Sequence, residues 1–232
     1  MALPRIDVPS YSAILPSTGE SVKFRPFLVR EQKQLLIALA GDEEQQTQAA
    51  RDLVEACTQG VVTVKTHANY DIEYLFLQIR ARSVGETVDL ILTCGECQNQ
   101  QNASLDITSI TVDRPAGHDK NIDLGGGITL VMREPNPAEL SAVKESNDPD
   151  AIIALVAHGI QSIFKQDELF SAGDYSEAEL IDFVENLSPD NLVKINNYFA
   201  TLPALRHALE FTCSACGADN VAVLEGLQSF FG

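Results

Sequence analysis

Four of the five cysteines lie in two C-x-x-C pairs, Cys94 with Cys97 and Cys213 with Cys216. The two-residue gap lets both thiolates of a pair bind one ion while the backbone amides of the loop point at the sulfurs. Zinc in structural sites prefers four such ligands at about 2.3 Å in a tetrahedral arrangement. We therefore predict that the two pairs, which are separated by residues 98–212, meet in space and hold one structural zinc per chain.

The alternative is two independent pairs, either buried or redox-active. A thioredoxin-like pair would stand at the N-terminus of a helix within a βαβ unit. Here both pairs follow strand-like runs and precede polar or glycine turns. Residues 87–92 and 103–107 read as two strands on either side of the first pair, which is half of a zinc ribbon. This pattern favours the shared zinc.

Length, composition and charge limit the possible functions. The chain has 232 residues, of which 45% are hydrophobic, so it is long enough to bury a core. It contains no apolar run of about 18 residues, and its first residues are too polar for a signal peptide, which predicts use in a reducing cytoplasm. The formal net charge of −17 argues against binding to nucleic acid or to anionic membranes.

The periodicity of the sequence predicts an α+β fold that forms a single composite domain over residues 1–232. Asp148 is expected to cap a helix whose apolar residues continue as far as Ile160 and Ile163. A further short helical turn is expected to begin at Pro203. The expected elements are an N-terminal β-hairpin (1–28), a helical segment (29–84), a zinc-ribbon-like β element (85–110 with 209–224), a second β-hairpin (111–135) and a helical C-terminal half (136–208).

No arrangement of residues points to catalysis. The histidines have no recognisable metal or triad spacing, although His207 lies six residues before Cys213 and could serve as a second-shell or substitute ligand. Cys57 occupies an apolar helical position, which indicates a buried core thiol. The glycine triplet 125–127 lies between two strand-like runs and therefore predicts a hairpin turn instead of a phosphate-binding loop.

The last residues are apolar. Leu227, Phe230 and Phe231 either pack back onto the core of the protein or fill a pocket on a partner, since aromatic anchors concentrate binding energy at interfaces. These three residues are therefore candidate partner-binding residues.

Several segments resemble one protein family. The chain is similar to the T-even-like baseplate proteins of contractile-tailed bacteriophages, a family associated with the baseplate hub and its assembly. The resemblance extends over nearly the whole chain and is carried by LPRIDVP (3–9), LPSTGE (15–20), FRPFLV (24–29), FVENL (183–187), YFATLPALRH (198–207) and EGLQSFF (225–231).

The resemblance implies a structural or assembly protein and not an enzyme. It implies a location in the phage tail baseplate, with assembly in the host cytoplasm and with other baseplate or tail proteins as partners. No nucleic acid, membrane or small-molecule substrate is expected. The alternatives from the residues alone are a zinc-ribbon adaptor of a cytoplasmic complex, which predicts a basic face, and a thiol- or metal-dependent enzyme, which predicts a catalytic His or Glu beside the cysteines.

Overall fold

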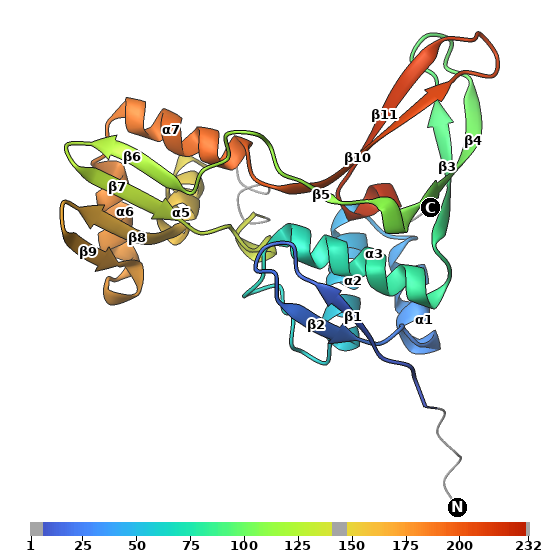
Figure 1. Ribbon diagram of the computed structural model, residues 1–232, viewed down its shortest axis with the longest axis horizontal. Helices are drawn as coiled ribbons and strands as arrows, with labels where there is room; N and C mark the ends of the chain where they lie inside the picture. The colour runs from blue at the N-terminus through green and yellow to red at the C-terminus, as the bar shows by residue number, and fades with distance from the viewer. Residues whose placement is uncertain (1–6, 141–147, 231–232) are drawn as a thin grey trace, which may run out of the picture. The chain divides into compact units, whose positions relative to one another are not determined.

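The computed structural model describes residues 7–140 and 148–230, apart from the side chains of Gln228 and Phe230. The chain divides into two units (Figure 1). Unit 1 comprises Met1–Asp113 with Ala204–Gly232, and unit 2 comprises Arg114–Pro203. Unit 2 is therefore inserted into the sequence of unit 1. Its two ends lie close together, because the residues that flank it, Asp113 and Ala204, are paired on neighbouring strands of unit 1. That the whole chain acts as one composite domain stays a prediction.

Unit 1 begins with a β-hairpin packed on helices. The hairpin turn is fixed on α3 by Asp71, a buried carboxylate that accepts hydrogen bonds from the backbone and the hydroxyl of Ser17. Fully buried apolar side chains of α3, among them Leu75 and Phe76, form the centre of the core. The elements are β1 (Tyr11–Ile14), β2 (Ser21–Phe24), α1 (Val29–Ala38), α2 (Glu43–Cys57) and α3 (Asn69–Ser83).

Two long hairpins complete unit 1, and they run side by side in Figure 1. In the first, β3 (Thr87–Thr93) pairs with β4 (Gln100–Asp106), and the short helix η1 (Ile107–Ser109) follows. In the second, β10 (Ala204–Thr212) pairs with β11 (Asp219–Glu225) and also with β5 (Val112–Asp113). The turn η3 (Leu227–Phe230) comes last. Leu105, Leu205 and Leu227 join the core that contains α3.

Unit 2 is an antiparallel sheet with helices. Its strand order is β6-β7-β8-β9, and the glycines 125–127 form the β6–β7 turn with positive φ angles. Its core contains Leu130, Met132, Val156 and Ile195. The elements are β6 (Asn121–Gly125), β7 (Ile128–Met132), α5 (Pro149–His158), β8 (Ile160–Lys165), β9 (Glu168–Ser171), η2 (Ala172–Asp174), α6 (Glu177–Glu185) and α7 (Pro189–Ala200). Within the described ranges, no helix is long and apolar enough to cross a bilayer.

The class is α+β as predicted, but the helical C-terminal half (136–208) is wrong. Helix α5 ends at His158, and Gly159 closes it by donating its N–H to the carbonyl of Leu155. A Cβ at Gly159 would lie 2.9 Å from the terminal methyl group of Met132, so this flexible side chain would have to shift to admit it. Ile160 and Ile163, expected on the helix, instead lie in β8, which pairs with β7. The backbone of Gly159 is still right-handed helical (φ −72°), so the helix ends where pairing of β8 with β7 begins and not at a left-handed glycine.

The second correction concerns residues 204–208, where a helical turn was expected. Together with residues 209–212, which were expected in the zinc-ribbon-like β element, they form the nine-residue strand β10, in which Leu205, His207, Leu209 and Phe211 alternate with exposed residues. Alanine, leucine, arginine and glutamate all favour helix, but pairing with β11 on one side and β5 on the other decides the outcome.

A buried carboxylate fixes the position of α1. Glu31 is 4% exposed and lies 3.0 Å from a guanidinium nitrogen of Arg25 and 2.6 Å from Nε of Arg30. It also accepts a hydrogen bond of 2.7 Å from the backbone N–H of Leu28. Burial alone would raise the pKa of Glu31, but the hydrogen bonds from Arg30, Arg25 and Leu28 outweigh it and lower the pKa to about 2.

We predict that Glu31→Gln lowers the free energy of unfolding by about 2–3 kcal/mol at pH 7, because it leaves Arg25 without its ionic partner. The ionised Glu31 stabilises the fold fully above its ordinary pKa of 4.5, and this stabilisation is lost as the pH falls from 4.5 towards 2. Urea unfolding between pH 7 and pH 3 checks this. The difference in the free energy of unfolding between wild type and variant should shrink at low pH. A difference that does not change with pH would contradict the account. Glu55→Gln, at an exposed position on α2, is the control.

Candidate metal centre

Each cysteine pair lies in a tight turn at the tip of one hairpin. Cys94 follows β3 and Cys213 follows β10 directly. In both turns the residue after the second cysteine has a positive φ, 60° at Gln98 and 73° at Gly217, and donates its N–H to the carbonyl of the first cysteine at 3.0 and 2.9 Å. The N–H groups of Cys94 and Cys213 in turn donate to the carbonyls of Asn99 and Ala218. The two turns therefore have the same backbone hydrogen bonding.

The four sulfurs converge on one point. All of them lie within 4.8 Å of one another, with 3.7 Å between Cys94 and Cys216 and 3.6 Å between Cys97 and Cys213. A disulfide would require about 2.05 Å. Four thiolates at about 2.3 Å from a tetrahedral ion lie about 3.8 Å apart. The spacing between the pairs therefore fits thiolates around a metal ion and not disulfides.

Two amide side chains hold the hairpin tips against each other. Asn220 on β11 accepts a hydrogen bond of 2.9 Å from the N–H of Gly95, and Gln101 on β4 accepts one of 2.8 Å from the N–H of Ser214. Asn220 also donates to the sulfur of Cys94 at 3.5 Å, and Gln101 donates to the carbonyl of Thr212 at 3.2 Å. Each tip is thus fixed by a side chain from the other hairpin.

Gln101 and Asn220 were not identified from the sequence. They occupy equivalent positions, each four residues after the second cysteine of its pair. The repeated pattern C-x-x-C-x-x-x-[Q/N] was therefore the signal that could have found them. Each of the two side chains accepts a hydrogen bond from the cysteine turn of the other hairpin, so the two tips are related by an approximate two-fold symmetry.

The turns also favour the thiolate form of the first cysteine in each pair. The N–H groups of Cys216 and Ala215 point at the sulfur of Cys213 and lower its pKa from 9.0 to about 6. The N–H groups of Cys97 and Glu96 likewise lower the pKa of Cys94. Thiolates and not thiols bind metals. A set of four sulfur donors suits zinc or another thiophilic ion, and it leaves no position for a catalytic water.

The other candidate residues lie elsewhere. Among the residues that the structure describes, the four cysteines form a group that could hold a metal ion, and His207, half-buried on β10, is not part of it. Cys57 is 1% exposed, and burial raises its pKa to about 11, so it is a core thiol. Leu227 is 4% exposed and packs in the core of unit 1. The side chain of Phe230 and the whole of Phe231 fall outside the described residues.

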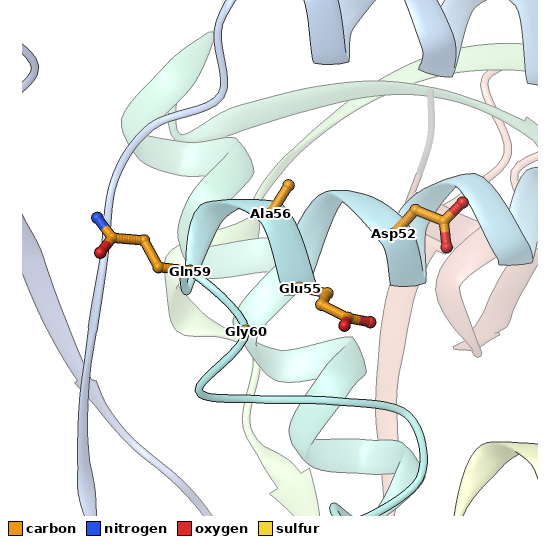
Figure 2. Close-up of a pocket in the computed structure, with 5 residues that line it drawn as sticks. All are labelled: Asp52, Glu55, Ala56, Gln59 and Gly60. Carbon is orange, nitrogen blue, oxygen red and sulfur yellow. The ribbon is translucent and has the colours of Figure 1, made fainter.

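Figure 2 shows a shallow depression at the C-terminal end of α2. It is lined by Asp52, Glu55, Ala56, Gln59 and Gly60. Two exposed carboxylates without a nucleophile or a base beside them do not form a catalytic constellation. The depression is of interest only for its negative charge.

The comparisons with known proteins give one match. The profile of the family described as "T4 bacteriophage base plate protein" matches residues 8–232, nearly the whole chain. No curated protein and no solved structure matches. The profile match confirms the resemblance seen in the sequence segments. The chain belongs to the T4 bacteriophage base plate protein family.

Proposed function

We propose that this chain is a structural or assembly component of the hub region of a contractile phage tail, and that it acts through contacts with other baseplate proteins. The observation that carries the proposal is the family match over residues 8–232. Membership of a baseplate family places the chain among virion components. The net charge of −17 fits partners with basic patches, since complementary potentials guide docking, and disfavours nucleic acid.

One zinc ion per chain is part of the proposal. Its role would be structural, because the four thiolates of Cys94, Cys97, Cys213 and Cys216 occupy all four positions of a tetrahedral ion. The ion would join the tips of two hairpins from distant parts of the sequence, so metal binding would contribute to the folding of unit 1. A zinc-ribbon adaptor would need a basic face, and a thiol-dependent enzyme would need an acid or base near the sulfurs. The two cysteine turns contain no Lys or Arg, which argues against the adaptor. Their one carboxylate, Glu96, is exposed, and four thiolates around one ion would leave no open position for a substrate, which argues against the enzyme.

The proposed role is tested by complementation. A phage that lacks this gene should produce no complete baseplates, and wild-type protein supplied in trans should restore them, as counted by electron microscopy of lysates. Normal baseplates in the absence of the protein would contradict the proposed function.

We predict that Cys213→Ser loses most of the bound zinc and lowers the Tm by several degrees, because the remaining three thiolates bind the ion more weakly. Metal analysis and thermal unfolding check this. Cys57→Ser is the matched control: it changes a buried thiol far from the cluster and should keep about one zinc per chain. Full zinc content in the Cys213 variant would argue against the four-cysteine site.

We predict that Asn220→Ala lowers zinc affinity roughly 10- to 100-fold, since it removes the bonds to Gly95 and to the Cys94 sulfur. Gln101→Ala should have a similar effect through Ser214. Competition with a chromogenic chelator measures the affinity. Asn102→Ala, an exposed amide on the same strand as Gln101, should leave it unchanged. Equal affinities for all three variants would show that the amides do not support the site.

The terminal residues allow stability and partner binding to be separated. Leu227→Ala should lower the free energy of unfolding by about 2–4 kcal/mol, because Leu227 is buried in the core. If Phe230 and Phe231 bind a partner, their joint change to Ala should leave stability within about 0.5 kcal/mol of wild type and still reduce baseplate assembly. Normal assembly with the double variant would remove the partner-binding role.

A further inference from the structure

Strand β11 forms an open edge of its sheet in unit 1. The strand order is β11-β10-β5, so β11 pairs with a neighbour on one side only. At the turn, Cys213 donates its N–H to the carbonyl of Ala218, and hydrogen-bonded pairs alternate along antiparallel strands. Every second residue of β11 therefore bonds to β10, whereas Asp219, Val221 and Val223 direct their N–H and C=O groups away from it.

The open edge has defined ends. The next outward residue, Glu225, is already bonded: its N–H donates to the hydroxyl of Ser229 at 3.2 Å, and that hydroxyl donates to its carbonyl at 2.8 Å. The opposite edge of the sheet is covered in part by β5 and by Gln101, whose amide donates to the carbonyl of Thr212. Within the described ranges, the outward backbone groups of residues 219–223 bond to no other residue.

Strand β11 lacks the common protections of an edge strand, which are proline, lysine and β-bulges. It contains neither of these residues, and its pairing with β10 runs through seven residue pairs without a bulge. The side chains of Val221 and Val223 are 60% and 57% exposed and lie on one face, because side chains alternate along a strand. Another extended segment is the structure that matches a row of outward N–H and C=O groups. The edge itself therefore selects strand addition.

Charge limits the kind of strand that fits. Residues 87–106 and 207–225, which form the two hairpins, contain no Lys or Arg and six carboxylates: Asp89, Glu96, Asp106, Glu210, Asp219 and Glu225. Arg206 precedes the second stretch and is paired with Glu225 at 2.9 Å. Glu210 lies opposite Val221 on β10, so it shares the exposed face with the two valines and Asp219. A strand that carries Lys or Arg beside apolar residues complements this face.

A second copy of β11 is a poor occupant. The one symmetric register that uses all three outward residues has Val221 at its centre. It would bring two copies of Asp219 and two of Glu210 to one face, with no Lys or Arg in either hairpin to compensate them. Each chain also adds a net charge of −17. A strand from a different protein avoids this repulsion.

Building on the baseplate role proposed above, we infer that an extended segment of a different baseplate subunit adds to β11 as a further strand, paired with residues 219–223. Its main-chain groups bond to the outward N–H and C=O groups of β11. Its apolar side chains cover Val221 and Val223, and a Lys or Arg lies beside Asp219. In such complexes the main-chain bonds supply affinity and the alternating side chains supply specificity.

Site-specific photocrosslinking in infected cells tests this inference. The full chain carries p-benzoylphenylalanine in place of Val223, and it complements a phage that lacks the gene. We expect a crosslink to one other baseplate protein, mapped by mass spectrometry to a segment that combines apolar residues with Lys or Arg. The control carries the photoreactive residue in place of Ile91, which is 69% exposed on β3 of the other hairpin, and should not give this product.

Proline tests the main-chain hydrogen bonds. Because the N–H of Val221 points away from β10, Val221→Pro removes only the donor that is offered to the partner, and an edge strand tolerates proline at such a position. The crosslink from position 223 should fall several-fold, while the Tm of the purified protein stays close to that of the parent. Val221→Thr keeps the N–H and should keep the crosslink. Asp219→Lys, which leaves the backbone unchanged, should also lower it several-fold, and it decides the question if the proline variant unfolds.

The inference is overturned by a crosslink to a second copy of the chain or to a segment without Lys or Arg, or by a yield at position 223 no higher than at position 91. It is also overturned if the crosslink persists in a folded Val221→Pro variant or, where that variant unfolds, in Asp219→Lys. Complete baseplates counted in the same lysates separate the two proposals. If the protein is required for baseplates but position 223 gives no crosslink, only the strand-addition inference fails. If baseplates form without the protein, the proposed function fails as well.

Discussion

The meeting of four cysteine sulfurs is the constraint on which unit 1 depends. Cys94 and Cys97 come from one hairpin and Cys213 and Cys216 from another, with the whole of unit 2 between them in the sequence. Closing a loop of this length costs conformational entropy that local contacts do not offset. The strand pair β5–β10 brings the chain back, since Asp113 and Ala204 are paired, and the amides of Asn220 and Gln101 align the hairpin tips. A metal bound at the sulfurs would then fix the arrangement.

This organisation separates stability from recognition. The cysteine cluster, the core around α3 and the Glu31 ion pair hold unit 1 together, whereas Val29, Leu36 and Ile37 on α1 are exposed in the part of the chain that the structure describes. A baseplate protein has to present surfaces to its neighbours while remaining folded before assembly.

The sequence predicted local features well where one physical signal dominated. The predicted helix start at Asp148 is confirmed, because its side chain accepts a hydrogen bond from the free N–H of Asp150. The cysteine spacing predicted the meeting of the two pairs. Residues 160–165 and 204–208 were misjudged, because their helix-compatible composition is overruled by strand pairing with partners that sequence spacing does not reveal. The repeated spacing after each cysteine pair marks Gln101 and Asn220, but the partners of their hydrogen bonds depend on how the two hairpins meet.

X-ray absorption at the zinc edge of the purified full-length protein tests the central claim most directly. Four sulfur neighbours at about 2.3 Å, with no nitrogen or oxygen in the first coordination sphere, are predicted by the four-cysteine cluster. A spectrum with nitrogen or oxygen ligands, or protein purified under reducing conditions that binds no zinc when zinc is supplied, would contradict the account.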